Sequence, residues 1–122
     1  MSIIEINAGT IHFEEFGPKD GRPVVFVHGF ACDRTAWRPQ FDDLSRDHRC
    51  VAVDLRGRGE SPATPPFDVS TAADDLAALI AQLGIDRPVV VGHSLGGLVA
   101  LVLNYRHPEL VRGIVTGASP IT

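Results

Sequence analysis

The stretch Gly92-His93-Ser94-Leu95-Gly96 predicts a sharp turn that presents a serine between a strand and a helix. Pro88-Val89-Val90-Val91 precedes it and is typical of a short strand, and the apolar residues 98–103 after it can begin a helix. Glycine at positions 92 and 96 removes Cβ atoms that would clash where the strand meets the helix. Five residues can match this pattern by chance, but the strand and the helix supply the context that the motif requires.

Ser94 is the candidate nucleophile of this chain, because attack requires a hydroxyl that stands clear of the backbone. The predicted turn places Ser94 at a helix N-terminus, where N–H groups and the helix dipole favour negative charge. The backbone N–H of Leu95 then points toward a developing oxyanion. A serine nucleophile also needs a histidine base and an acid that orients the base.

Short strands alternate with helical segments, which predicts an α/β fold with a mostly parallel sheet of about six strands and flanking helices. The predicted strands are residues 3–6 and 11–16, which form a hairpin, and residues 24–27, 50–53, 88–91 and 113–116. The predicted helices are residues 37–44, with Pro39 in the first turn, residues 70–83, with Ser70 as N-cap and Gly84 after the end, and the helix after the serine turn, which stops at Pro108.

The composition indicates one globular domain, residues 1–122, and excludes several classes of partner. The net charge of −4 argues against binding to nucleic acid or to anionic membranes, and no segment is apolar for long enough to span a bilayer. The first residues lack the pattern of a signal peptide. Cys32 and Cys50 lack C-x-x-C spacing and favour reduced thiols over a disulfide, which predicts a cytoplasmic protein. No cofactor fingerprint or metal-ligand cluster occurs, so no cofactor is expected.

Two more motifs directly follow predicted strands. His28-Gly29-Phe30 comes after the apolar run 24–27, and Asp54-Leu55-Arg56-Gly57-Arg58-Gly59-Glu60-Ser61 comes after the strand 50–53. The second motif lacks the G-K-[ST] of a phosphate loop and the context of a dinucleotide-binding loop, which excludes both interpretations. Asp54 can be interpreted as an acid that orients a base, but hydrogen bonding within its own loop is favoured.

Taken in this order, the motifs make the chain similar to the α/β-hydrolase superfamily over essentially all 122 residues. The residues that carry the resemblance are His28-Gly29-Phe30, Trp37, the Asp54 to Ser61 loop and Gly92-His93-Ser94-Leu95-Gly96-Gly97. The chain looks like the branch that contains small esterases, enol-lactonases, perhydrolases and carbon–carbon bond hydrolases. Serine at position 94 in place of aspartate speaks against haloalkane dehalogenases and epoxide hydrolases.

The resemblance implies roles for the residues around Ser94. The backbone N–H of Phe30 is the implied second oxyanion donor beside that of Leu95, and a plain strand-to-loop turn is the alternative. The implied supporting residues are His28, Gly29, Gly92, His93 and Gly96, with structural roles for the two histidines. Trp37 can line part of a small apolar pocket or belong to the core.

The resemblance also implies that part of the machinery lies outside this sequence. In the family the chain order is Ser, then Asp or Glu, then His, on a core sheet of about eight strands. The chain is therefore expected to be the N-terminal half of the core, without the cap and without the triad acid and histidine. The turn at residues 92–96 that presents Ser94 is called the elbow below. Asp74, Asp75 and Asp86 are expected on the wrong side of the elbow to orient a base.

Two hypotheses of function follow. The first is the nucleophile-bearing half of a serine hydrolase of ester-like carbonyls, with weak or no activity alone. The alternative is a non-catalytic, truncated or engineered folding module that self-associates. A small-ligand binding protein is a third, less specific interpretation. Because residues 98–103 are apolar all round and the strand 113–116 would be an open edge, we expect a homodimer or a complex with a complementary C-terminal half.

Overall fold

The computed structural model describes residues 2–6, 9–29, 33–62 and 68–117. In chain order the elements are β1 (Ser2–Ile6), β2 (Gly9–Phe16), β3 (Arg22–Val27), the 3-10 helix η1 (Arg34–Trp37), α1 (Arg38–Leu44), β4 (His48–Val53), α2 (Val69–Gln82), β5 (Val89–His93), α3 (Leu95–Arg106), the 3-10 helix η2 (Pro108–Leu110) and β6 (Gly113–Gly117). The predicted order of strands and helices is confirmed, with most elements one to three residues longer than predicted.

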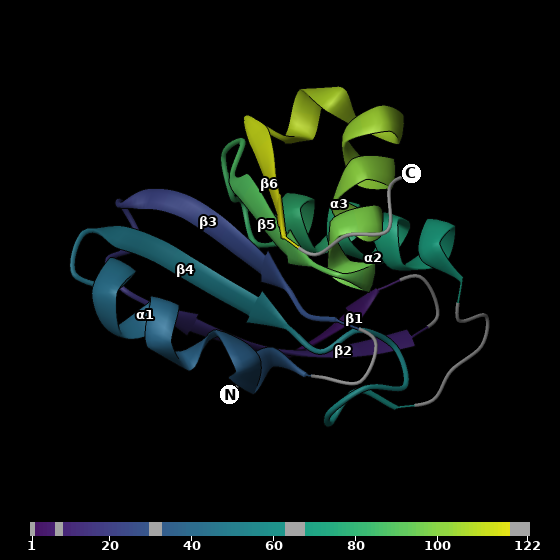
Figure 1. Cartoon of the computed structure of the whole chain (residues 1–122), viewed down its shortest axis with the longest axis horizontal. Helices are drawn as coiled ribbons and strands as arrows, with labels where there is room; N and C mark the ends of the chain where they lie inside the picture. The colour runs from purple at the N-terminus through teal and green to yellow at the C-terminus, as the bar shows by residue number, and fades with distance from the viewer. Residues whose placement is uncertain (1, 7–8, 30–32, 63–67, 118–122) are drawn as a thin grey trace.

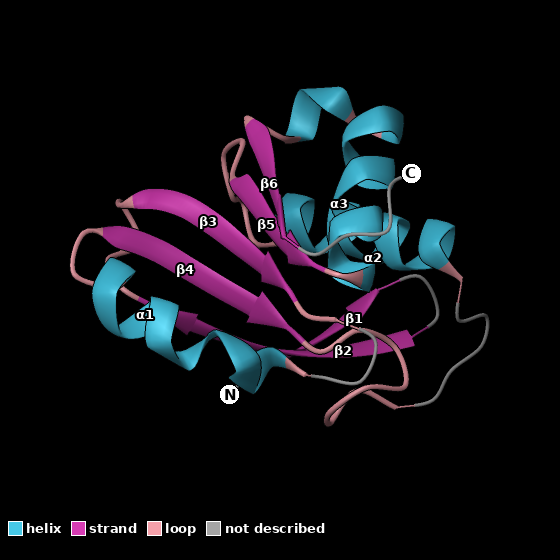
Figure 2. Ribbon diagram, viewed as in Figure 1, coloured by secondary structure: helices cyan, strands magenta, loops and turns pink. Residues whose placement is uncertain are grey.

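The six strands form one sheet in the order β1-β2-β4-β3-β5-β6. The pairs β1–β2 and β2–β4 are antiparallel, whereas β3–β4, β3–β5 and β5–β6 are parallel. Figure 2 shows the strands as one twisted layer. The predicted α/β class with a mostly parallel sheet is therefore confirmed.

Helices cover both faces of this sheet, with α2 and α3 on one face and α1 on the other (Figure 1). Alternate residues of each central strand point to opposite faces. Val25 of β3 packs in a large cluster with residues of α2 and α3 such as Leu79 and Leu103. Phe26, the next residue, packs in a smaller cluster with Phe41 of α1 and Trp37. The core is thus much larger on the α2–α3 side.

The beginning of α2 differs from the prediction. Asp68, not Ser70, is the N-cap: its carboxylate Oδ1 accepts a hydrogen bond from the backbone N of Thr71 at 2.7 Å. Both residue types are good caps, and the choice depends on where the preceding chain enters the helix. Gly84 follows the helix with φ of 63°, the left-handed conformation that the sequence predicted.

Residues 98–103 of α3 are all apolar in sequence, yet only one side of the helix is buried. Val99, Ala100 and Leu103 are fully buried, whereas Tyr105 is 87% exposed. Among the described strands β6 pairs only with β5, and its Val115 is 54% exposed. None of the described helices is long and apolar enough to cross a membrane.

The parallel strands β3, β4 and β5 end at the same edge of the sheet, which brings three motifs together. His28 follows β3, Asp54 follows β4, and Ser94 follows β5. Functional residues of parallel α/β sheets gather at the carboxyl ends of the strands. This edge is therefore the place to look for a site.

Candidate active site

Ser94 lies at the junction of β5 and α3 in a strained backbone conformation. Its φ of 55° and ψ of −117° fall in the left-handed half of conformational space, which residues other than glycine rarely occupy. Two backbone hydrogen bonds hold it there: Ser94 N donates to the carbonyl of Gly117 and Gly97 N donates to the carbonyl of Ser94, each at 2.9 Å. The strain holds a serine at the first turn of a helix, where the sequence predicted it.

Close backbone packing requires glycine on both sides of Ser94. A Cβ atom on Gly92 would lie 2.3 Å from the carbonyl oxygen of Gly96. A Cβ atom on Gly96 would lie 2.2 Å from the carbonyl oxygen of Val27 and 2.7 Å from that of His28. The elbow therefore presses directly against the end of β3.

Gly29, one of the implied supporting residues, lies beside Ser94. A Cβ atom on Gly29 would lie 3.4 Å from the Cβ of Ser94 and 3.1 Å from Nδ1 of His93. Leu95, the first residue of α3, has an N–H that lies in the first helical turn, where N–H groups lack intrahelical acceptors. Phe30, the implied second donor, and Cys32 lie outside the described residues.

His28 is fully buried and has a structural set of contacts. Its Nε2 accepts a hydrogen bond from the backbone N of Leu55 at 3.0 Å, and its Nδ1 lies 2.7 Å from the carbonyl oxygen of Gly29. Because Nε2 accepts, we assign the proton to Nδ1, which donates to that carbonyl. Burial lowers the pKa of His28 below its ordinary value and keeps the ring neutral.

A hollow of about 230 Å³ opens next to the elbow. Its lining residues are His28, Gly29, Ala36, Trp37, Gln40 and His93. Trp37 also packs on Phe26 with 5.0 Å between ring centroids, so it serves both the core and the wall of the hollow. The hollow borders the elbow through His93, the residue before Ser94.

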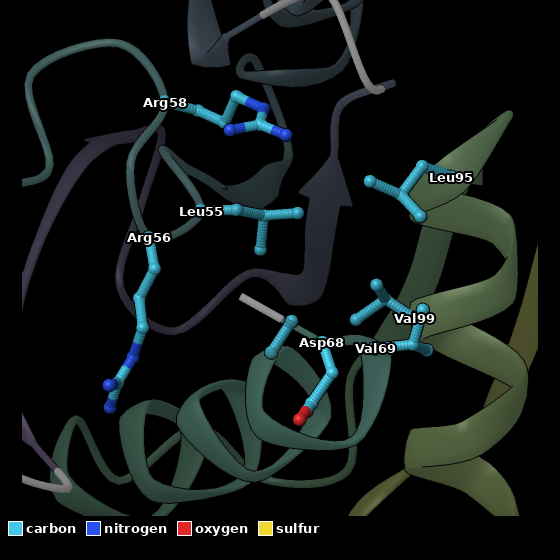
Figure 3. Close-up of a pocket in the computed structure, with 8 residues that line it drawn as sticks. Leu55, Arg56, Arg58, Asp68, Val69, Leu95 and Val99 are labelled. Atoms are coloured by element: carbon cyan, nitrogen blue, oxygen red, sulfur yellow. The ribbon is translucent and has the colours of Figure 1, made fainter. Parts of the chain in front are cut away.

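A second, smaller hollow of about 40 Å³ is lined in part by Leu95, the first residue of α3 (Figure 3). Leu95 and Val99 of α3 face Leu55 across it, while Arg56 points away toward α2 (Figure 3). There Arg56 forms a bidentate ion pair with Asp75, at 2.7 Å from Nε to Oδ2 and 3.0 Å from Nη2 to Oδ1. The side chains of this pair are 5% and 3% exposed.

The loop after β4 uses Asp54 for hydrogen bonding, in agreement with the favoured interpretation. Its Oδ1 accepts from the backbone N of Arg34 at 2.8 Å, and its Oδ2 accepts from the backbone N of Glu60 at 2.9 Å. Sequence reasoning missed Arg34 and its second partner Glu14, as well as the pair of Arg56 with Asp75. Glu14 lies in a predicted strand with a polar face, so nothing in the sequence marks it as buried.

The remaining histidines have acidic neighbours. His12 Nδ1 lies 3.9 Å from Glu60, His48 Nδ1 lies 2.7 Å from Asp47, and His107 Nε2 lies 3.5 Å from Asp74. Asp74 and Asp75 lie on α2, and Asp86 precedes β5. Within the described ranges no group of three or more His, Cys, Asp or Glu side chains could hold a metal ion.

The chain matches a protein-family model and is similar to several known hydrolases. Residues 22–121 match the model described as alpha/beta hydrolase fold. The chain is 40% identical over 103 residues to a pimeloyl-[acyl-carrier protein] methyl ester esterase of Neisseria meningitidis serogroup B, covering 84% of this chain and 38% of the esterase. It is 35% identical over 112 residues to epoxide hydrolase 3 of Xenopus tropicalis, covering 89% of this chain and 30% of that enzyme.

Among solved structures, the chain is similar to Est816, described as an N-acyl homoserine lactone degrading enzyme. The TM-score is 0.91 with 31% sequence identity, and the match covers 97% of this chain and 45% of Est816. The chain therefore spans less than half of the length of each of these three proteins.

Proposed function

The chain belongs to the alpha/beta hydrolase fold family, and on that premise we propose that it carries the nucleophile of a serine hydrolase of ester-like carbonyl compounds. The observation that supports this proposal is the strained conformation of Ser94, with φ of 55° between β5 and α3. Backbone strain of this kind persists where surrounding structure holds it, and it gathers at active sites. In this proposal the strain serves to present the Ser94 hydroxyl.

The proposed chemistry is acyl transfer. The Ser94 oxygen forms a bond to the carbonyl carbon, the alcohol departs with a proton, and water then releases the acid from Ser94. The backbone N–H groups of Leu95 and Phe30 are proposed to donate to the oxyanion that forms on the carbonyl oxygen. The hollow lined by Trp37 and Gln40 is proposed to receive part of the substrate.

The base and its orienting acid are proposed to come from outside these 122 residues. The histidines nearest to Ser94 are His28, whose two ring nitrogens are hydrogen-bonded within its own loop and the next, and His93, whose Nδ1 faces Gly29. A complementary segment of the size that the longer relatives contain could supply both residues. Without it, an oxyanion hole and binding alone leave weak catalysis in other serine hydrolases.

The choice between two classes of hydrolase is proposed from the residue at the elbow. One relative is an epoxide hydrolase and another is a methyl ester esterase. The elbow residue here is Ser94, and the sequence motif with serine favours the esterase-like class over the epoxide hydrolases. We therefore propose ester-like carbonyl compounds as substrates.

A fluorophosphonate probe tests this proposal on the chain as it is. The Ser94 oxygen would bond to phosphorus, fluoride would leave, and the hydroxyl proton would pass to solvent, so the label can be located by peptide mass spectrometry. We expect label on Ser94 and none in Ser94→Ala. Ser70→Ala is the matched control, because Ser70 is an exposed serine in the first turn of α2. Equal labelling of the wild type and Ser94→Ala contradicts the proposal.

Turnover is tested separately with p-nitrophenyl acetate. We expect slow hydrolysis above the buffer rate, lost in Ser94→Ala. Equal rates for the two proteins would remove the enzymatic interpretation for this chain alone, even if Ser94 accepts the probe.

The exposed edge of β6 favours the second candidate, a self-associating module. Among the described strands β6 pairs with β5 alone, and Val115 on it is 54% exposed. Pairing of two β6 edges across a two-fold axis would satisfy backbone groups and cover Val115. We propose a homodimer of this kind, and a monomer in sedimentation velocity at micromolar concentration excludes it.

A cytoplasmic location is part of the same proposal. Cys50 is buried as a free thiol, and burial raises the pKa of Cys50. A buried protonated thiol behaves as a small apolar core residue and needs no oxidising compartment. Localisation of a tagged chain in its native host tests this directly.

A further inference from the structure

Asp54 connects the loops beside the elbow, because its carboxylate, its backbone N and its carbonyl all form hydrogen bonds. Besides the carboxylate contacts to the backbone N of Arg34 and of Glu60, its own N donates to the carbonyl of His12 at 2.9 Å. Its carbonyl accepts from Oγ of Ser61 at 2.6 Å. The residue is fully buried. A buried carboxylate with this many partners fixes their relative positions.

The Arg34 side chain is held by three carboxylates, the outermost of which is Glu60, with 3.4 Å from Nη2 of Arg34 to Oε1 of Glu60. Its Nη1 pairs with Asp54, and its Nε lies 2.9 Å from Oε1 of Glu14 on β2. The side chains of Arg34 and Glu14 are 8% and 9% exposed, so the charges are shielded from water and depend on one another. The start of η1 is thereby tied both to β2 and to the end of β4.

Glycine at position 59 closes the loop around the same carboxylate. Gly59 has φ of 51°, and a Cβ atom on it would lie 2.4 Å from Cγ of Asp54. The turn therefore packs directly on the charged group rather than leaving room for water.

A short series of contacts connects this arrangement to Ser94. Leu55, the residue after Asp54, donates its N–H to Nε2 of His28. Gly29, the residue after His28, has its Cβ position 3.4 Å from the Cβ of Ser94. A shift of the loop after β4 would therefore move the backbone that faces the nucleophile.

We infer that Asp54 is a positioning residue for Ser94, which, together with Arg34, holds His28 and Gly29 against the elbow. The inference rests on the proposed function, because it takes Ser94 to be the nucleophile. Asp54 itself does not take part in bond making, and it is distinct from the acid that would orient a histidine. Its effect reaches Ser94 only through Leu55, His28 and Gly29.

The test compares Asp54→Asn with Glu15→Gln at a temperature where circular dichroism shows both to be folded. Glu15 forms a partly buried pair with Arg49 near the amino end of β4, remote from the elbow, with 2.5 Å from Oε2 to Nε. We expect the second-order rate of fluorophosphonate labelling at Ser94 to fall at least tenfold in Asp54→Asn and less than twofold in Glu15→Gln. Similar rates in these two variants overturn the inference. Arg34→Lys, which keeps the charge but loses the fork of the guanidinium, is the second variant if Asp54→Asn does not fold.

Amide NMR separates this inference from the proposed function. If the wild type takes no label, the proposed function fails, and the amide resonances of Gly29, His93 and Ser94 then decide the positioning role. We expect them to shift in Asp54→Asn or Arg34→Lys and to stay in place in Glu15→Gln. Unchanged resonances in the first two variants overturn the inference whatever the labelling shows.

Discussion

The two sides of the candidate site are held by different kinds of interaction. On the elbow side, residues 92–97, backbone atoms pack so closely that Gly92 and Gly96 leave no room for a Cβ atom. On the loop side, residues 28–29 and 54–60, buried charges and hydrogen bonds hold the chain. Substitutions that add volume should therefore destabilise the elbow side. Changes of charge or protonation should destabilise the loop side.

The largest effect is expected from Gly96→Ala on the elbow side. The new methyl group would lie 2.2 Å from a backbone oxygen of β3, which cannot move without disturbing the sheet. We expect a loss of about 4 kcal/mol or more in the free energy of unfolding, measured with urea.

Gly113→Ala is the matched control for this substitution, because a Cβ atom there would have nothing within 4 Å. If the free energy of unfolding falls equally in both variants, close packing does not hold the elbow. The proposed difference between a tightly packed elbow side and a charged loop side would then be wrong.

On the loop side, Asp75→Asn should cost about 3 kcal/mol, because it removes one charge of a buried ion pair. Urea unfolding monitored by circular dichroism measures it. The double variant Arg56→Met/Asp75→Leu should regain most of the loss, since an apolar pair of similar volume removes the buried charges. A double variant as unstable as Asp75→Asn would show that shape, rather than charge, holds this loop.

The pH dependence of stability should come from the loop side. Burial lowers the pKa of His28, so below about pH 6.5 the unfolded chain binds a proton that the folded chain does not. The His28 contribution is therefore complete above pH 6.5 and is lost as the pH falls toward its lowered pKa. The slope from this one proton is at most about 1.4 kcal/mol per pH unit.

The measurement is urea unfolding at a series of pH values from 7 to 5 for the wild type and His28→Gln. We expect the variant to be less stable at pH 7 and to show a flatter pH dependence. His48→Gln, which changes a half-buried histidine far from the elbow, is the matched control for the substitution. A His28→Gln curve parallel to the wild type counts against a buried neutral His28.

The smallest effect is expected at the start of α2, outside both sides of the candidate site. Asp68→Ala removes the acceptor for the N–H of Thr71 and should lower the Tm slightly, whereas Ser70→Ala should leave it unchanged. Thermal unfolding by circular dichroism measures both, and a larger drop for Ser70→Ala would restore Ser70 as the cap.

The elbow side was predictable from sequence because its cause is local. Gly92 and Gly96 flank Ser94 within five residues, and a strand pattern before them and an apolar helix after them define the turn. The loop side was predictable only in part. The sequence placed Asp54 in a hydrogen-bonded loop, but its partner Arg34 lies 20 residues earlier and Glu14 lies 20 residues before that.

The sequence by itself determined the order of strands and helices, the mostly parallel sheet and the position of the serine turn. These features follow from hydrophobic periodicity and from glycine, which act over a few neighbouring residues. Only the tertiary structure decided which charges are buried together and which nitrogen of His28 accepts a hydrogen bond. Those outcomes depend on desolvation and on pairing between distant segments, and both exist only once β2, β3 and β4 lie side by side.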